Sequence, residues 1–383
     1  MRVTYKYRLK PTKTQQRQLE RTLEVCRCVY NETLAARKNA YEQRGESVSL
    51  YSTQRLLPLW KHAKPELKQV HSQVLQNVQV RVDLAFQAFF RRVKQGEEPG
   101  YPRFKGFGWY DSFTYPQYGN GVVLHEDTLR LSKVGEVKVI LHRPIQGAIK
   151  TVTVQRSVGK WYVGFSVEVA AQPLPVSSEV VGIDLGLKTF AVLSNGEQVK
   201  RQRWMKNDAA DVARLQRKKE KLPKGSKERR KALHALNHAY QRSTHRRTNF
   251  AHQESRKLVN RYGLIVFEDL QIQQMQANGS KVINRNIADV AWGQFVQYTA
   301  YKAENAGRGV MLVNPRGTTQ ECSGCGKFVP KDLSVRVHEC PHCGLKIDRD
   351  LNAALNILRR GLASVGADMS VTHRSHAAFA VVE

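Results

Sequence analysis

The spacing of four cysteines constrains the fold of this chain more than any other feature. The pattern is C-x2-C-x14-C-x2-C, with a glycine directly after each pair, and it comprises Cys322, Cys325, Cys340 and Cys343. A two-residue gap lets both thiolates of one turn reach a single tetrahedral ion, and four thiolates leave no position for water. The pattern therefore predicts a structural zinc ribbon. Two disulfides are the alternative, which an intracellular location disfavours.

Acidic residues lie beside this cluster and in two apolar stretches before it. "LKIDRDLNAALNI" carries Asp348 and Asp350 at the start of a predicted helix, "VVGIDLG" carries Asp184, and "LIVFEDL" carries Glu268 and Asp269 near its end. Carboxylates from two strands and a helix can converge on Mg2+, and two such ions can drive phosphodiester hydrolysis. Other interpretations are open. Asp269 competes with Glu268 as the inward residue of its strand. Asp348 as the N-terminal cap of the helix, and Asp350 as an ordinary first-turn acid, would have structural roles only.

The charge balance indicates a polyanionic partner. The chain has 62 Lys and Arg against 33 Asp and Glu, a net charge of +29, yet 41% of it is hydrophobic. That hydrophobic content excludes a disordered polycation. A membrane partner is disfavoured because there is no run of roughly 18 apolar residues. The N-terminal "MRVTYKYRLK" has no signal-peptide core. We therefore expect a cytoplasmic, intracellular protein that binds nucleic acid.

Hydrophobic periodicity divides the chain into two parts with different patterns. Residues 2–9 and 110–172 alternate with period two, which predicts an antiparallel β domain, and the sequence between them predicts one helix to about residue 43 and another over 64–94. From residue 180, buried strands alternate with helices. The stretch "IADVAWGQFVQYTAYKAENAG" predicts one helix, and a last helix is expected to end near Gly361. Cys26 falls on an apolar helical stripe and is expected in the core.

Five stretches give the sequence a specific resemblance. "GIDLGLKTFAV", "VFEDL", "ADVAWGQF", "TTQECSGCG" and "DRDLNAALNI" resemble the TnpB family of transposon-encoded RNA-guided nucleases, small relatives of type V CRISPR effectors. The likeness runs over nearly the whole chain. It implies a RuvC-like site whose catalytic, magnesium-binding residues are Asp184, Glu268 and Asp350. "NPRGTTQ" replaces the family's more usual hydroxyl-rich lead into the first knuckle, a departure that we expect to leave catalysis unaffected.

The resemblance also implies an α+β multidomain architecture. A β-barrel wedge domain holds a helical recognition insertion, and an RNase H-like (RuvC) α/β nuclease domain is interrupted by the zinc ribbon. The expected boundaries are 1–10 and 107–175 for the barrel, 11–106 for the helical insertion, 176–315 and 346–365 for the nuclease domain, 316–345 for the ribbon, and 366–383 for a disordered tail.

Two surfaces are candidates for nucleic-acid binding. Residues 214–257 are strongly basic and include Arg229, Arg230, Arg246 and Arg247; we expect them to follow an RNA–DNA duplex through its phosphates, although a solvated helical hairpin is the simpler interpretation. The segment "GYPRFKGFGWYDSFTY", with Arg103 and Lys105, mixes cations with rings that stack on bases. By resemblance, the N-terminal part reads a short DNA motif. Candidates for base contact are Tyr51, Gln76 and Thr114.

The expected function is RNA-guided cleavage of double-stranded DNA next to a short transposon-associated motif. We expect it to require two Mg2+ ions, replaceable by Mn2+, one structural Zn2+, and a guide RNA derived from the transposon end. We expect a monomer in the complex, at the prokaryotic nucleoid. Two alternatives are a catalytically idle RNA-guided regulator, which the intact acids disfavour, and a transposase performing strand transfer.

Overall fold

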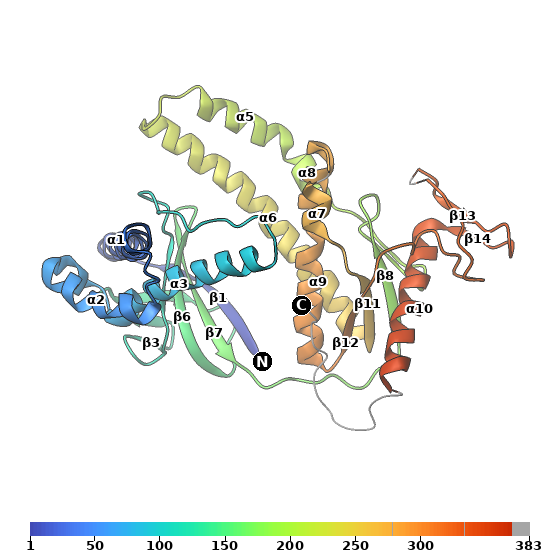
Figure 1. The fold of residues 1–383 in the computed structure, drawn as a ribbon, viewed down its shortest axis with the longest axis horizontal. Helices are drawn as coiled ribbons and strands as arrows, with labels where there is room; N and C mark the ends of the chain where they lie inside the picture. The colour runs from blue at the N-terminus through green and yellow to red at the C-terminus, as the bar shows by residue number, and fades with distance from the viewer. Residues whose placement is uncertain (278, 333, 370–383) are drawn as a thin grey trace. The chain divides into compact units, whose positions relative to one another are not determined.

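The computed structural model describes residues 1–277, 279–332 and 334–369, and it divides into two compact units, Met1–Ala170 and Ala171–Glu383. The first unit contains a seven-stranded antiparallel sheet with helices, and the second contains a five-stranded mixed sheet with helices (Figure 1). None of the helices within the described ranges is long and apolar enough to cross a membrane.

The sheet of the first unit follows the period-two pattern of its sequence. Trp161, Val163, Phe165 and Val167 alternate into the core, as predicted. The order is β2-β6-β7-β1-β5-β4-β3, with β2 and β3 at the edges, so closure into a barrel stays a prediction. The seven strands are β1 (Arg2–Lys10), β2 (Ser112–Tyr115), β3 (Val122–His125), β4 (Thr128–Leu131), β5 (Gly135–Ile140), β6 (Ala148–Ser157) and β7 (Lys160–Glu168).

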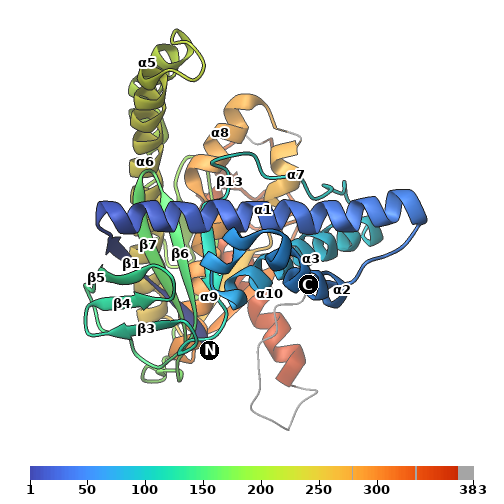
Figure 2. The same cartoon turned by 90° about the vertical axis from the view of Figure 1, so that its left-hand side faces the viewer.

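Three helices and a short 3-10 turn lie between β1 and β2, and Figure 2 shows α1 as one long helix. Thr12 and Gln15 form a capping box at the start of α1. Cys26 on this helix is fully buried, as expected. The helix predicted over 64–94 begins too early. Pro65–Gln69 form a 3-10 turn and Val70 takes an extended conformation at φ −116°, so the α-helix begins only at Ser72. The elements are α1 (Lys13–Arg44), α2 (Leu50–Ala63), the 3-10 turn Pro65–Gln69 and α3 (Ser72–Lys94).

The sheet of the second unit has three parallel strands and two antiparallel ones, in the order β10-β9-β8-β11-β12. One face carries Ile183 and Phe267, which pack with Phe295 of α9 (Trp292–Ala306) in the larger core cluster of this unit. The opposite face carries Val266, which packs with Ile357 of the last helix, α10. The strands are β8 (Val180–Leu185), β9 (Ala191–Leu193), β10 (Gln198–Val199), β11 (Leu264–Glu268) and β12 (Gly309–Val313).

Two glycines let α10 (Arg349–Met369) lie directly on this second face (Figure 1). A Cβ on Gly182 of β8 would lie 2.3 Å from the carbonyl oxygen of Ala354, and a Cβ on Gly361 would lie 2.5 Å from Val266 Cγ2. Any larger side chain at these positions would push the helix off the sheet. The helix is therefore held close to the strands that carry Asp184 and Glu268.

The remaining helices correct two predictions. The helix predicted over "IADVAWGQF" is two helices, because Ala291 takes a left-handed conformation between them at φ 55°. The last helix runs past Gly361 to Met369, so the expected tail begins too early at 366, and residues 370–383 lie outside the described residues. The helices before α10 are α4 (Trp204–Asn207), α5 (Ala209–Glu220), α6 (Lys227–Arg261), α7 (Ile272–Ala277), α8 (Lys281–Val290) and α9 (Trp292–Ala306).

Candidate active site and zinc centre

The four cysteines of the ribbon come together without forming disulfides. All are free, and their sulfur atoms lie within 4.8 Å of one another. The Sγ atoms of Cys322 and Cys343 are 3.6 Å apart, as are those of Cys325 and Cys340. Zinc–sulfur bonds of about 2.3 Å in a tetrahedron place the sulfurs about 3.8 Å apart. The thiol set therefore fits one zinc ion, next to the short hairpin of β13 (Val337–Glu339) and β14 (Lys346–Asp348).

Asp184 and Glu268 lie at the same level of two neighbouring strands. In the parallel register of β8 and β11, Ile183 is the partner of Phe267, and each acid is the next residue along its strand. Side chains alternate between the faces of a strand, so Asp184 lies on the face of Gly182, and Glu268 on that of Val266. Both carboxylates therefore point to the face that α10 covers.

The direction of α10 brings Asp350 to the same place. The helix passes Gly182 at Ala354, and Asp350 lies four residues earlier, about 6 Å back along the axis. Asp184 lies two residues further along β8, about 6.6 Å from Gly182. The chain thus gathers three acids that are distant in sequence at one end of the sheet.

Burial and the charges of neighbouring residues shift the pKa values of the buried acids. Asp184 and Glu268 are only 8% and 7% exposed. Burial raises the pKa of Asp184 well above its usual value, the charges of Glu268 and Asp350 raise it further, and Arg349 opposes them. Burial also raises the pKa of Glu268, whereas a hydrogen bond from Thr318 and the charge of Arg360 lower it. A bound cation would relieve this repulsion, so the three residues fit a divalent metal ion.

Two arginines hold the carboxylate of Asp350 in this structure. Arg349 donates to Oδ1 from Nε and Nη2 at 3.0 and 2.8 Å, and Arg336 of the ribbon lies 3.7 Å from Oδ2. The oxygens of the three acids do not all lie within 4.8 Å of one another, unlike the sulfurs of the ribbon. Binding a shared ion would therefore require the side chain of Asp350 to turn from the arginines toward the strands.

The two competing acids have different surroundings. Asp269 is exposed and accepts a hydrogen bond from Gln271 at 3.4 Å. Asp348 accepts from the backbone N–H groups of Asp350 and Leu351 at 2.9 and 3.0 Å, which makes it the N-terminal cap of α10. The geometry favours Glu268 and Asp350 as the inward pair.

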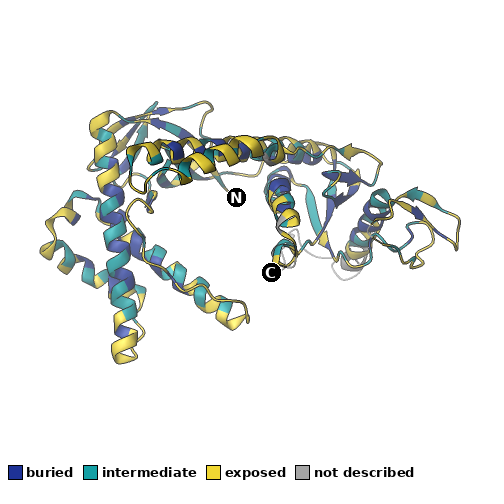
Figure 3. Ribbon diagram, turned by 90° about the horizontal axis from the view of Figure 1, so that it is seen from above, coloured by how far each residue is buried: buried dark blue, intermediate teal, exposed yellow. Residues whose placement is uncertain are grey.

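The four arginines of the α5–α6 hairpin that the sequence singled out for duplex binding differ in their contacts. Arg229 donates to the carbonyls of Lys219 and Leu222 at 2.9 and 2.7 Å, which ties the hairpin turn together. Arg246 pairs with Asp208 at 3.3 Å. Arg247 donates to the carbonyl of Ala288. Arg230 is exposed, and α5 has no buried residue (Figure 3).

The residues of the first unit that are candidates for nucleic-acid contact are mostly exposed to solvent. Arg103 and Gln76 are exposed, and so is Tyr51, whose ring is covered by Arg55 at 4.6 Å. Lys105 lies over the ring of Tyr30, with Nζ 5.7 Å from its centre. Thr114 is half-buried, accepts from Arg81 at 2.8 Å, and lies 2.8 Å from the hydroxyl of Thr153. Its hydroxyl is therefore already used within the protein.

A group of polar residues beside the acids was not predicted from the sequence. Thr318 Oγ1 lies 2.5 Å from Glu268 Oε1, and both side chains are buried. Asn352 and Asn356 are fully buried on α10 and contact the same loop. The signal was present in two asparagines one helical turn apart and in the hydroxyls of "GTTQ".

Fold and site together define a basic α+β protein with a four-thiolate centre and a buried acidic cluster, and comparison with known proteins gives its family. Family models match three segments: a helix-turn-helix domain at residues 1–46, a transposase domain of the OrfB/IS605 type at 152–279, and a Cas12f1-like TNB domain at 292–357.

Two relatives match along almost the whole chain. A protein of Streptomyces pristinaespiralis named as an RNA-guided DNA endonuclease is 33% identical, over 94% of this chain and 89% of the relative. InsQ of Escherichia coli, with the same description, is 29% identical over 94% and 92%. A TnpB-like protein of Acanthamoeba polyphaga mimivirus is 32% identical over 36% and 27%. The chain therefore belongs to the TnpB family of RNA-guided DNA endonucleases.

Solved structures of CRISPR effectors are similar only at a distance. The mini-RNA-guided endonuclease CRISPR-Cas_phi3 is 10% identical, covers 94% of this chain and 92% of its own, and has a TM-score of 0.46. At this level the likeness carries no argument about the site.

Proposed function

We propose that this enzyme uses a guide RNA from the transposon end to cut double-stranded DNA next to a short motif. The observation that carries the proposal is the alignment of Asp184 and Glu268 on adjacent parallel strands, with the helix of Asp350 against them. The three carboxylates would hold Mg2+, which supplies an activated water and stabilises the leaving oxygen in phosphodiester hydrolysis. Family membership supports the guide RNA and the DNA substrate.

The residues around the three acids have different roles in the proposed site. Burial of Asp184 and Glu268 keeps bulk water away from the acids and strengthens their attraction for a cation. Arg349 and Arg336 lie beside Asp350, where they are available to a phosphate once the carboxylate turns toward metal. Asp348 fixes the first turn of α10, so the position of Asp350 depends on this cap.

The other parts of the chain fit the binding of a guide–target duplex. We assign the first unit to motif recognition, with Tyr51, Gln76, Arg103 and Lys105 exposed or half-exposed on it. In the second unit we assign the RuvC-like nuclease domain to the mixed sheet and its helices, and duplex binding to the α5–α6 hairpin. The ribbon carries one structural Zn2+.

Replacing single acids tests the site. Asp184→Asn, Glu268→Gln and Asp350→Asn each remove one charge, and we expect cleavage to be lost while guide RNA and target are still bound. Asp269→Asn is the matched control for Glu268, because Asp269 is its exposed neighbour. Asp348→Asn keeps an oxygen for the cap and is expected to retain cleavage. Normal cutting by Asp350→Asn together with loss in Asp348→Asn would move the assignment to Asp348.

Sequencing the RNA that co-purifies with the protein tests the guide. We expect one discrete RNA that ends in sequence complementary to the cut DNA. Absence of a discrete RNA, combined with metal-dependent joining of DNA ends, would favour the transposase alternative.

A further inference from the structure

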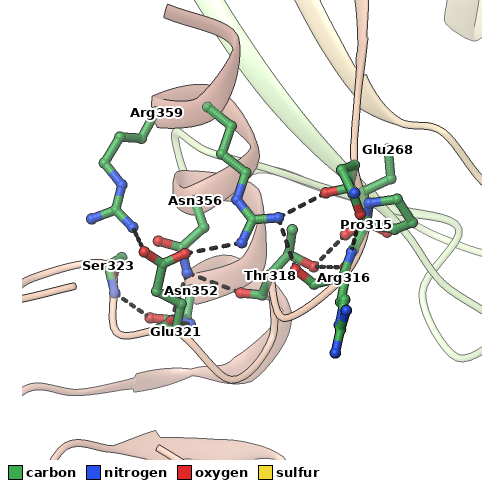
Figure 4. A network of polar contacts seen from close by, with 11 residues as sticks. Glu268, Pro315, Arg316, Thr318, Glu321, Ser323, Asn352, Asn356 and Arg359 are labelled. Atoms are coloured by element: carbon green, nitrogen blue, oxygen red, sulfur yellow. Dashed lines mark hydrogen bonds and ion pairs between the residues drawn. The ribbon is translucent and has the colours of Figure 1, made fainter. Parts of the chain in front are cut away.

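A loop with a buried threonine at its centre connects the zinc ribbon to the acidic cluster (Figure 4). It leads from β12 to the first cysteine knuckle, and Thr318 lies in its middle. The hydroxyl of Thr318 is 2.5 Å from Oε1 of Glu268, and the two residues are 2% and 7% exposed. A buried hydroxyl this close to a carboxylate fixes the orientation of the acid.

The single proton of this hydroxyl has two acceptors within reach. Oγ1 of Thr318 also lies 3.1 Å from the carbonyl oxygen of Pro315. Hydrogen bonds from a hydroxyl to an ionised carboxylate are short, about 2.5–2.7 Å, and about twice as strong as neutral ones. The proton is therefore donated mainly to Glu268. Oε2 of the same carboxylate takes no part in this bond and remains for a cation.

Two asparagines of α10 hold the backbone around Thr318. Asn356 donates from Nδ2 to the carbonyl oxygens of Thr318 and Glu321 at 2.9 and 2.7 Å. Asn352, one turn earlier, donates to the carbonyl of Glu321 at 2.7 Å and accepts from the N–H of Ser323 at 2.9 Å. Both asparagines are fully buried. They bind the loop and the start of the knuckle to the helix that begins beside Asp350.

Two arginines complete this attachment on the more exposed side. Arg359 and Arg360 pair with the two carboxylate oxygens of Glu321 at 2.6 and 3.0 Å. Arg360 also donates to the carbonyls of Asn314 and Arg316 at 2.7 and 2.9 Å (Figure 4). Residues 314–323 are thus bonded to α10 along their length.

We propose that Thr318 is a positioning residue for Glu268, and that Asn352 and Asn356 make the first zinc knuckle part of the scaffold of the active site. The inference rests on the proposed role of Glu268 as a metal ligand. The path runs from Asp350 on α10, through the two asparagines, to the loop of Thr318 and so to Glu268. Two acids on different elements are in this way held in one geometry.

The test compares two substitutions at one position. Thr318→Val keeps the shape and removes the hydroxyl, whereas Thr318→Ser keeps the hydroxyl. Residues that orient a metal ligand typically contribute about 10–100-fold in metal affinity or activity. We expect Thr318→Val to lose metal affinity and single-turnover rate by about this range, and Thr318→Ser to restore most of both. Mn2+ binding is measured by electron paramagnetic resonance on the protein–guide complex, and cleavage separately.

Controls separate orientation from folding. Thr319→Val makes the same chemical change at the neighbouring, half-buried threonine and is expected to bind Mn2+ and cut like the parent. Zinc content and guide binding should be unchanged in all three variants. If Thr318→Val does not fold, Thr318→Ala gives the same comparison with a smaller side chain. Asn356→Ala, with zinc still bound, is expected to lower the Mn2+ affinity less than Thr318→Val.

The outcomes distinguish this inference from the proposed function. If Glu268→Gln binds Mn2+ and cuts normally, the assignment of the acids is wrong. If Glu268→Gln is inactive but Thr318→Val matches the parent in Mn2+ affinity and rate, the positioning role is wrong. Equal losses in Thr318→Val and Thr318→Ser would also overturn it, because packing rather than the hydroxyl would then matter. If Asn356→Ala binds Mn2+ and cuts like the parent, the ribbon is not part of the scaffold of the active site.

Discussion

The cores of the two units differ in what they bury. In the first unit, the buried polar residues are uncharged: Thr22, Thr33, Thr53 and Gln79. In the second unit, the described residues bury four acidic or basic side chains outside the ribbon: Asp184, Glu268, Asp289 and Lys302. Burying a charge is costly unless it is paired or bound to metal. The second core therefore accepts an electrostatic cost that the first avoids, and two of its four groups are Asp184 and Glu268 of the candidate site.

The ribbon is a third case that sharpens this contrast. Within the described part of residues 316–345, the buried side chains are Thr318, Cys322, His338 and Cys340, with no buried aliphatic or aromatic side chain among them. A segment without an apolar core must obtain its folding energy from bound metal.

The largest effect is expected on removing a zinc ligand. Cys322→Ser should lower the metal content from about one zinc per chain to none, because three thiolates hold the ion poorly. Cleavage should be lost with it, because the loop of Thr318 enters the first knuckle. Elemental analysis and a cleavage assay measure both. Cys28→Ser, outside the ribbon, is the control, and an active, metal-free Cys322→Ser protein would contradict the prediction.

The next effect concerns the apolar core of the first unit. Phe165 is fully buried in its sheet, and Phe165→Ala should cost about 3–5 kcal/mol of unfolding free energy. Phe107→Ala is the matched control, because Phe107 is 83% exposed, and it should stay within about 0.5 kcal/mol of the parent. Denaturant unfolding measures both. Similar losses in the two variants would mean that Phe107 is buried in solution.

A smaller effect, of opposite sign, is expected in the second unit. The pKa of Asp184 is raised above 3.8 in the folded protein, so the native state binds its proton more tightly than the unfolded chain. The stability from this proton is fully present below about pH 4 and is lost as pH rises through the raised pKa. Without divalent cations, Asp184→Asn should therefore be more stable than the parent near neutral pH. The two should converge near pH 4.

Thermal unfolding across pH, with and without Mg2+, measures this difference. Added Mg2+ should stabilise the parent more than the variant, because binding to the native state shifts the folding equilibrium. A variant that is less stable than the parent at every pH would show that burial of Asp184 costs nothing.

The smallest effect is expected in the exposed hairpin. Arg230→Gln should weaken guide binding and reduce the slope of log affinity against log salt by about 0.7–0.9, as for one phosphate contact. Arg229 is the comparison, because it ties the hairpin turn through two carbonyls. Arg229→Gln should lower thermal stability as well. An unchanged slope in Arg230→Gln would move the duplex-binding surface away from this helix.

The sequence predicted those helices, strands and sites whose pattern repeats over a few neighbouring residues. Alternation in β1 and β7, the apolar stripe of α1 that carries Cys26, and the cysteine spacing each depend on residues within a few positions of one another. Predictions failed where the local signal was weak or non-repeating. Periodicity could not show the extended conformation of Val70 before α3 or the left-handed turn at Ala291, since the backbone of one residue decides each.

The sequence alone determined which residue types are available: four thiols at ligand spacing, three acids in apolar surroundings, and an excess of positive charge. Only the tertiary structure decided how the acids are held. The register of β8 against β11 aligns Asp184 with Glu268, and the absence of a side chain at Gly182 lets the helix of Asp350 pack against the strand. The bond from Thr318 to Glu268 joins residues 50 positions apart. Such contacts depend on packing between distant segments, which no local pattern encodes.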